Sequence, residues 1–422
     1  MTTTKNNEHK KLNFSSEREQ SQACLNSAEH EKNQGRKVLN VPNLRFPEFQ
    51  GEWEKCKLGD VMNFSTTRVN SSELNEDNYV STENMLQDYQ GIVDAKSVPE
   101  DVNVISFSCG DTLISNIRPY LKKVWKATYN GGCSSDVFVL KANDNIESDY
   151  LHYVIANDKF INFVMSGAKG VKMPRGDKNQ MKTYSLSLPQ IQEQKKISKM
   201  LSLLDERIAT QNKIIEDLKK LKSAIIEKHY SQVKKRTTGI ADLGEPFSVG
   251  SLAKDDLAEI GTPCVIYGEL FTTYGEIISN IESYTNKTDG MILSKKGDLL
   301  FPSSTTVDAM SLIAPSVINV DGVVLGGDMF GIHISHNYNA QYLSYYFNHI
   351  AKRQLAKFAK GSTIIHLHYA DIEKAKILLP SLEEQDRMAK CIMSLDAKIN
   401  IENFFISLLN SQKTHLLRQM FI

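Results

Sequence analysis

The sequence has no excess of charge of either sign, because 50 Lys and Arg residues balance 50 Asp and Glu residues. A uniformly basic surface is therefore excluded, and any nucleic-acid site must be a local patch. The chain also has no uninterrupted apolar run long enough to cross a membrane, and its start, MTTTKNNEHKK, lacks the apolar core of a secretion signal. These absences predict a cytoplasmic protein.

Cysteine is scarce, and its spacing fits no metal or disulfide framework. Zinc sites need closely spaced cysteine pairs, and disulfide scaffolds are short and cysteine-rich. We therefore expect reduced and mostly buried thiols at the six cysteine positions, 24, 56, 109, 133, 264 and 391.

Motifs for catalysis and cofactor binding are missing as well. The sequence contains no Gly-rich loop ending in Gly-Lys-Ser/Thr, no HExxH, no GxSxG, and no Asn/Asp-Pro-Pro-aromatic motif of a methyltransferase. His366 and His368 stand two residues apart without a cysteine partner, which is more typical of a surface or phosphate-contacting pair than of metal ligands. We expect no catalytic residue, no metal and no cofactor in this chain.

What the sequence does contain is an internal repeat. The residues around Pro189 reappear around Pro380, at an offset of 380 minus 189, or 191. Gly110-Asp111 reappears as Gly297-Asp298 at an offset of 187, so small insertions separate two copies of one fold. The length of 422 residues suits roughly three domains or fewer.

The segment after each proline is rich in Glu, Gln, Lys, Leu and Ile and has no glycine, which predicts a long helix. Apolar residues step by four and three along both segments, the spacing of a coiled-coil seam. The seam positions are Ile197, Leu201, Leu204, Ile208, Ile215 and Leu218 in the first helix, and Met388, Ile392, Leu395, Ile399, Ile406 and Leu409 in the second. Each seam is interrupted at the same place by a polar residue, Gln211 or Glu402, which either fixes the register or lies at a solvated edge.

The two helices either pair with each other or pack separately, each on its own domain. We favour antiparallel pairing, because it lets two similar domains sit at opposite ends of one shared rod. At about 1.5 Å per residue, the helix from Gln190 to Tyr230 spans up to roughly 60 Å. Helix length would then set the distance between the domains.

The segments outside these helices alternate short apolar runs with Gly, Asn and Ser, which predicts strands and turns. The apolar runs that mark these strands and turns are 91–93, 111–117, 136–140, 291–300 and 322–334, and helices are expected around 149–166 and 339–360. The predicted fold class is α+β, with two pseudo-symmetric globular domains joined by an antiparallel two-helix coiled coil. Its parts are a polar N-terminal tail (1–40), a first domain (41–189), a central helix (190–236), a second domain (237–380) and a C-terminal helix (381–422).

Basic and hydroxyl residues cluster on loops in both copies. In the first copy they are Arg118, Lys122, Lys123, Lys126, Lys169, Lys172, Arg175, Lys178 and Lys182. In the second copy they are Thr305, Thr306, Lys352, Arg353, Lys357, Lys360, Ser362, Thr363, His366 and His368. Such loops can follow a phosphate backbone and project side chains toward base edges. One cluster alone is more simply a solvated face, but similar clusters in both repeats favour two nucleic-acid-reading domains.

Three features together carry a family resemblance. They are residues 41–49 (VPNLRFPEF), residues 110–120 (GDTLISNIRPY) and the two Leu-Pro junctions ending in Glu-Gln (LPQIQEQ and LPSLEEQ). With them the chain resembles, over residues 41–422, the specificity subunit of type I restriction-modification systems. The second copy departs from the first at residues 301–306 (FPSSTT). The family implies such a difference, since its two target recognition domains read different half-sites.

The resemblance implies a non-catalytic DNA-binding subunit. Its two recognition domains would read the halves of a split, asymmetric site, while the paired helices set the gap and bind two modification subunits. Those partners would carry S-adenosylmethionine and methylate adenine, and two restriction subunits using ATP and Mg are optional further partners. The rival interpretation is a coiled-coil scaffold that binds only protein, and a degenerate methyltransferase is third. The recognition sequence itself is not predicted, because base readout depends on loop placement.

Overall fold

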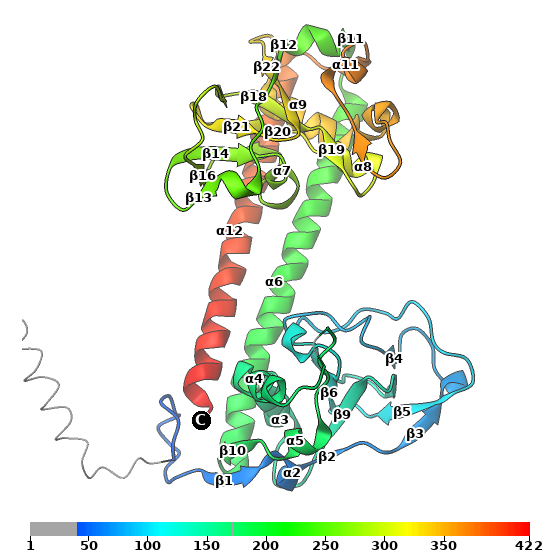
Figure 1. The fold of residues 1–422 in the computed structure, drawn as a ribbon, viewed down its shortest axis with the longest axis vertical. Helices are drawn as coiled ribbons and strands as arrows, with labels where there is room; N and C mark the ends of the chain where they lie inside the picture. Colours follow the sequence, from blue (N-terminus) through cyan, green and yellow to red (C-terminus); the bar gives the residue numbers. More distant parts are fainter. Residues whose placement is uncertain (1–39, 171) are drawn as a thin grey trace, which may run out of the picture. The chain divides into compact units, whose positions relative to one another are not determined.

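The computed structural model of the chain describes residues 40–170 and 172–422. These divide into two compact units, one made of residues 40–206 with Asn410–Ile422 and the other of Arg207–Leu409. Each unit combines one globular domain with parts of both long helices (Figure 1). The predicted tail lies outside the described residues, apart from Asn40. Within the described part of the chain, no helix is both long enough and apolar enough to span a membrane.

The first unit is built from short strands and four short α-helices. Its strands are β1 (Glu54–Lys57), β2 (Met62–Phe64), β3 (Arg68–Asn70), β4 (Tyr79–Val80), β5 (Asn103–Phe107), β6 (Thr112–Ser115), β7 (Val124–Lys126), β8 (Gly131–Cys133), β9 (Val137–Ala142) and β10 (Ser185–Leu188). Its helices are α2 (Leu58–Val61), α3 (Ser148–Ile155), α4 (Asp158–Ser166), α5 (Lys178–Lys182) and the 3-10 turns η1 (Ser71–Glu73) and η2 (Pro119–Leu121). The strands form two four-stranded sheets, ordered β2-β9-β6-β7 and β3-β5-β8-β4, and a ribbon β1-β10.

The second unit contains the same kinds of element with larger sheets. Its strands are β11 (Arg236–Gly239), β12 (Gly244–Ser248), β13 (Leu257–Ala258), β14 (Thr262–Ile266), β15 (Ile277–Ile278), β16 (Ser283–Thr285), β17 (Ile292–Leu293), β18 (Asp298–Pro302), β19 (Ser304–Thr305), β20 (Ser316–Ile318), β21 (Val324–Gly326), β22 (Met329–Ile334), β23 (Ile365–His366) and β24 (Lys376–Leu379). Its short helices are α7 (Glu269–Thr272), α8 (Ala309–Leu312), α9 (Ala340–His349), α10 (Lys352–Leu355), α11 (Tyr369–Ile372), η3 (Ile240–Leu243), η4 (Lys254–Asp256) and η5 (Ala356–Phe358). The strands form two five-stranded sheets, ordered β12-β22-β18-β20-β15 and β13-β16-β14-β21-β17, and two separate ribbons, β11-β24 and β19-β23.

The two domains share strand register as well as fold class. In the first, β6 pairs with β9 so that Thr112 lies opposite Leu140. In the second, β18 pairs with β22 so that Leu299 lies opposite Ile332. The offset from Thr112 to Leu299 is 187, as for the repeated Gly-Asp, and that from Leu140 to Ile332 is 192, one residue more than the 191 of the two prolines. The predicted α+β class and the two similar domains are confirmed.

A repeated Gly-Asp turn leads into an inner strand of each domain, β6 in the first and β18 in the second. Gly110 and Gly297 both have φ of 93°, a left-handed conformation that favours glycine. Asp111 accepts a hydrogen bond from Ser108 N at 2.8 Å, and Asp298 accepts one from Lys295 N at 2.8 Å. The two dipeptides thus recur because each makes the same turn.

The repeated glutamine of each Leu-Pro junction ties the long helix to its domain. Gln194 Nε2 donates to Pro189 O at 2.9 Å, and its Oε1 accepts from Glu147 N at 2.8 Å, at the start of α3. The second copy repeats both bonds, at 3.0 Å each, through Gln385, Pro380 and Asn339. Both glutamines are buried, so each junction is fixed by a satisfied polar side chain.

The two long helices, α6 (Ile191–Gln232) and α12 (Leu382–Met420), pair with each other. In the second unit Gln211 contacts Glu402 and Lys222 contacts Asp396, so rising numbers on α6 meet falling numbers on α12. In the first unit, the C-terminal part of α12 packs into the domain core, where the Phe421 ring stacks on Tyr150. The antiparallel pairing predicted from the sequence is confirmed.

All twelve predicted seam side chains are at least partly removed from solvent. Eight are buried, namely Ile197, Leu201, Leu204, Ile215, Met388, Ile392, Ile399 and Leu409. The other four, Ile208, Leu218, Leu395 and Ile406, are half-buried.

Three local expectations are wrong or incomplete. Residues 91–93 form no strand, and Ile92 makes only an isolated bridge with Met85. The expected helices 149–166 and 339–360 are each interrupted, the first after α3, where Asn157 caps α4 instead of continuing α3. The five described cysteines form no disulfide, but Cys109 and Cys391 are exposed, so the thiols are not mostly buried.

Candidate nucleic-acid interface

In the first unit, a glycine-containing hairpin lies beside the loop that follows β6. Lys169 and Arg175 exchange backbone hydrogen bonds of 3.1 and 3.0 Å, and Gly170, with φ of 96°, turns the chain between them. Arg118 N donates to Pro174 O at 2.8 Å, which attaches the hairpin to the loop. We call residues 169, 170 and 172–175 the first hairpin.

In the second unit, residues 360–366 make the equivalent second hairpin. Lys360 and His366 exchange backbone hydrogen bonds of 2.9 and 2.7 Å, and Gly361 has φ of 113°. A side chain at Gly361 would also meet the carbonyl oxygen of Ile364, so glycine is needed there. Ser304 of β19 pairs with His366 of β23.

The two hairpins are attached to their domains in the same way. Gly176 N donates to Asn116 O at 3.1 Å, and Leu367 N donates to Ser303 O at 2.9 Å. The offsets from Gly176 to Leu367 and from Asn116 to Ser303 are 191 and 187, as in the sequence repeat. In each unit the hairpin and the loop to which it is attached therefore meet through equivalent backbone hydrogen bonds. We call the hairpin and this loop together the first frame in the first unit and the second frame in the second unit.

Some of the predicted DNA-binding residues of the first unit have partners inside the protein. Lys122 forms an ion pair of 2.8 Å with Asp158, the residue that begins α4. Lys126 forms an ion pair with Asp149 of α3, and burial lowers the pKa of its ammonium group. Lys126 thus connects β7, and Lys122 the turn before it, to the helices of their own domain.

Two further predicted DNA-binding lysines also contact groups of their own domain. Lys123 donates to the carbonyl oxygen of Thr82 at 2.6 Å. The Lys178 ammonium lies 4.7 Å from the centre of the Phe138 ring, at cation–π distance.

The remaining cations of the first unit face solvent on the loop and the first hairpin. The Lys169 side chain is 83% exposed and lies 3.5 Å from Asp177, and that of Arg175 is 56% exposed and lies 3.5 Å from Asp136. Arg118 and Lys172 are exposed, and neither has an ion-pair partner among the described residues. Exposed pairs at this distance hold side chains weakly. These four cations remain available to a ligand, whereas Lys182, also exposed, lies on α5.

The second hairpin carries hydroxyl and imidazole groups in place of most of these cations. Lys360 is 76% exposed and lies 2.5 Å from Asp371, whose pKa it helps to lower. The rings of His366 and His368 stack with centroids 6.1 Å apart. The exposed predicted residues are Thr306, Arg353, Lys357, Lys360, Ser362, Thr363, His366 and His368, while Thr305 and Lys352 are half-buried. Across the described residues, no group of three or more His, Cys, Asp or Glu side chains is placed to hold a metal ion.

Each domain is fastened to the long helices by a Tyr-Asp-Lys cluster. In the first unit, the Tyr153 hydroxyl donates to Asp205 Oδ2 at 2.8 Å, and Lys413 Nζ lies 2.6 Å from Asp205 Oδ1. The aspartate lies on α6 and the lysine on α12. The cluster therefore holds α3, α6 and α12 together.

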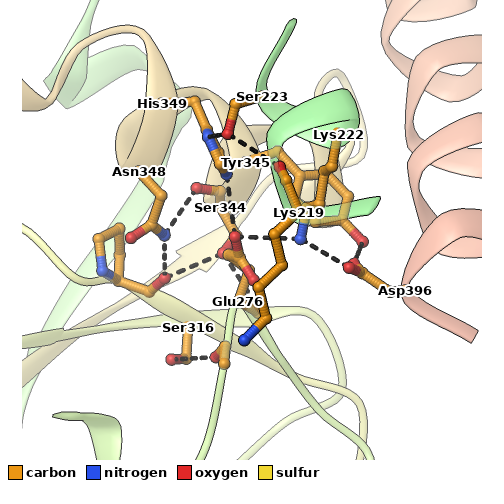
Figure 2. A network of polar contacts seen from close by, with 12 residues as sticks. Lys219, Lys222, Ser223, Glu276, Ser316, Ser344, Tyr345, Asn348, His349 and Asp396 are labelled. Atoms are coloured by element: carbon orange, nitrogen blue, oxygen red, sulfur yellow. Dashed lines mark hydrogen bonds and ion pairs between the residues drawn. The ribbon is translucent and has the colours of Figure 1, made fainter. Parts of the chain in front are cut away.

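The second unit repeats this cluster with the helices exchanged. Tyr345 donates to Asp396 Oδ2 of α12 at 2.7 Å, and Lys222 Nζ of α6 lies 2.6 Å from Asp396 Oδ1. Lys222 also lies 3.1 Å from Glu276 Oε1, which His349 Nε2 approaches to 3.0 Å, as Figure 2 shows. Burial alone would raise the pKa of Glu276, but the hydrogen bond from His349 and the charge of Lys222 lower it to about 2.

A second apolar face of α12 is left exposed, which the seam pattern does not predict. Met393, Ile401, Phe404 and Leu408 are between 40% and 65% exposed. With Ala397 they follow steps of four, four, three and four, which place them on one side of the helix. That spacing is present in the sequence, but the stronger seam pattern masks it. Exposed apolar stripes of this kind mark interaction surfaces.

The comparisons with known proteins agree on one family. A family model described as the type I restriction modification DNA specificity domain matches residues 50–220 and 237–409. The specificity subunit of the type I restriction enzyme MjaVIII from Methanocaldococcus jannaschii is 26% identical over 391 residues, covering 85% of this chain and 89% of the relative. The putative MjaX specificity subunit from the same organism is 27% identical over 330 residues, covering 72% and 75%.

Solved structures show the same fold at low sequence identity. The S subunit of a type I restriction-modification system from M. genitalium matches with a TM-score of 0.58 at 15% identity, covering 90% of this chain and 99% of that one. A chain from a structural study of assembly and conformational transition in a type I R-M system matches with a TM-score of 0.53 at 17% identity, covering 88% and 97%.

Proposed function

The chain belongs to the type I restriction-modification DNA specificity family, and we propose that each of its two domains reads one half of a split DNA site. The carrying observation is that both family matches, 50–220 and 237–409, contain the same hairpin-and-loop frame with different side chains. A shared frame gives both domains one way of docking on DNA. Different side chains on it allow two different half-sites, so that the whole site is asymmetric.

The charges of the described residues support contact through the two hairpins. Arg118, Lys169, Lys172 and Arg175 gather on the first frame, although the whole chain has a formal net charge of +0. A local cluster of this kind neutralises phosphates and fixes the protein's register on the duplex. The near-neutral remainder suits a subunit whose partners supply further phosphate contacts.

We propose that the paired helices set the gap between the half-sites. Helix α6 connects β10 of the first domain to β11 of the second without interruption. The two Tyr-Asp-Lys clusters fasten each domain to both helices, so a change in helix length would be passed on to the domains.

The exposed stripe of α12 is the proposed docking surface for a modification subunit. An apolar helix face with a solvated surround fits an amphipathic helix of a partner. In this assignment the chain is non-catalytic and holds no cofactor. S-adenosylmethionine and adenine methylation belong to two modification subunits, and ATP and Mg to restriction subunits where these join. The complex would act in the cytoplasm, where its DNA lies.

The docking surface is tested by Phe404→Asp. Because Phe404 is 65% exposed, the charge should not unfold the chain, but it should prevent co-purification with the modification subunit. Asn403→Asp, an exposed neighbour on a different side of the helix, is the matched control and should assemble normally. Normal assembly of Phe404→Asp would refute this surface.

Duplex binding by the complex with its modification subunit tests the proposed function itself. The probe is a duplex that carries the sequence identified by methylation mapping. Fluorescence anisotropy at several salt concentrations should show tight binding to this duplex and a negative slope of log K against log salt. A coiled-coil scaffold that binds only protein predicts no duplex binding at any salt concentration.

A further inference from the structure

Two exposed apolar side chains occupy equivalent places at the tips of the two hairpins. Met173 and Ile364 are each 49% exposed. Their numbers differ by 364 minus 173, or 191, the offset of the repeat. A single exposed apolar residue needs no explanation, but the same exposure at the same position of two diverged copies does.

The surroundings of both tips are those of a DNA-facing surface. Met173 stands between Lys172 and Arg175, and Ile364 stands between Thr363 and His366. Their neighbours supply phosphate and polar base contacts, which an apolar tip cannot make. The complementary feature of DNA is an apolar base edge, and the thymine methyl group is the one that the major groove presents.

The hairpins also have a suitable shape and a firm support. The major groove admits a two-stranded ribbon, and each hairpin is closed by two backbone hydrogen bonds and attached to a neighbouring segment by others. In the first frame Arg118 and Lys122 hold φ of 50° and 53°, left-handed conformations that non-glycine residues adopt at a cost. That the loop keeps them indicates a fixed loop geometry.

Side chains differ between the two frames at positions related by the repeat, and at one of these positions the backbone differs as well, since Arg118 is left-handed and Thr305 lies in β19. The equivalent pairs are Arg118 and Thr305, Met173 and Ile364, and Arg175 and His366. Arginine reads guanine by a bidentate contact, whereas threonine and histidine cannot form that contact. Such differences are what two distinct half-sites require.

Resting on the proposed function, we propose that Met173 and Ile364 are base-contacting specificity residues, each for its own half-site. Each contacts a thymine methyl in the major groove, and Arg175 or His366 beside it contacts a polar base edge. The chain thereby reads a T·A pair with the tip of each hairpin.

Met173→Ala and Ile364→Ala, in the complex with the modification subunit, test this inference. Affinity for the site that methylation mapping identifies should fall about 3- to 10-fold, the order expected for losing one or two buried methyl contacts, with an unchanged salt slope, because every phosphate contact is retained. Each variant should relax methylation at one half-site only. Leu44→Ala and Leu378→Ala, at 42% and 44% exposed, are matched controls outside the hairpins and should bind as the unaltered protein does.

Thymine-to-uracil replacement, which removes only the methyl group, locates the contact. One replacement per half-site should weaken the unaltered complex and have no further effect on the matching alanine variant. Unchanged affinity and site choice in both variants would overturn the inference. So would a rise in 2-aminopurine fluorescence at the half-site without any uracil effect, because the tip would then unstack bases. If the unaltered complex binds no duplex, the proposed function fails as well; if it binds and only the variants behave normally, this inference alone fails.

Discussion

Gln211 and Glu402 occupy the same position in the two repeats, and they hydrogen-bond to each other across the helix pair. Their numbers differ by 191, the offset of the repeat, and both side chains are buried, at 7% and 9% exposed. Each interrupts an otherwise apolar seam. A shift of the helices would leave the buried Gln211 amide without its partner, while Glu402 would keep only its ion pair with Lys398 on the same helix, so the pair specifies one register.

We predict that single and double substitutions of this pair behave differently. Glu402→Leu leaves the Gln211 amide buried and unpaired, which should lower the free energy of unfolding by about 1–3 kcal/mol. The double variant Gln211→Leu, Glu402→Leu should regain that stability, because an apolar pair needs no polar partner. Denaturant unfolding of the three proteins measures this. A double variant less stable than the single one would show that the seam does not pair as described.

The Lys222 cluster should be a major determinant of stability in the second unit. The Lys222 side chain is 7% exposed, and its removal in Lys222→Met leaves Glu276 and Asp396 without their shared cation. The loss should be about 3–5 kcal/mol in free energy of unfolding. Lys220→Met is the matched control, because the Lys220 side chain is 69% exposed and pairs only with Glu216 on the same helix. Equal thermal stability of the two variants would argue against the cluster.

Glu276 gives the second unit a defined sensitivity to acid. Its pKa is about 2 in the folded protein, below the ordinary value of 4.5. The unfolded chain therefore takes up the proton first, so the contribution of Glu276 is complete above about pH 4.5 and is lost as the pH falls toward 2. Glu276→Gln should remove this part of the pH dependence, about 1 kcal/mol per pH unit. Unfolding measured from pH 6 downward would contradict the assignment if both proteins lost stability in parallel.

The exposed cations of the first hairpin should contribute to DNA affinity through phosphates. Lys169→Ala, Lys172→Ala and Arg175→Ala together should lower the magnitude of the salt slope by roughly 0.9 for each lysine that no longer neutralises a phosphate, and the loss of Arg175 should in addition weaken the base contact that we assign to it. Lys122→Ala with Lys126→Ala is the comparison, because both lysines form ion pairs within the domain. That variant should lose stability and keep its salt slope. The assignment fails if the triple variant retains both affinity and slope.

Much of the fold could be predicted because residues that recur in both repeats make the same contacts in both domains. Gly110 and Gly297 recur because one turn needs a left-handed residue, and Gln194 and Gln385 recur because one junction needs a buried amide. The coiled-coil seam could also be predicted, since the four-three spacing of its apolar residues is visible in the sequence. These features depend on local geometry or on a period, and both can be read without coordinates.

The candidate interface was less predictable, because it depends on which partner a side chain finds. Lys122 and Lys126 belong to a basic cluster in the sequence, yet Asp158 and Asp149 from later helices pair with them. Nothing in the residues near a lysine specifies such a distant carboxylate. The role of Met173 could not be predicted either. An apolar residue is expected in the core, and only the structure shows that this one lies on the surface.

The central claim is that two domains each read a half-site and that helix length sets the gap between them. Its most direct test is methylation mapping of a variant with four residues inserted after Ala209 in α6 and four after Asn403 in α12. Both insertions lie on the same side of the Gln211 and Glu402 pair, so its register is kept. Each helix lengthens by about 6 Å, and at about 3.4 Å per base pair the unread gap should grow by one or two base pairs while both half-sites stay the same. Altered half-site letters with an unchanged gap would contradict the account.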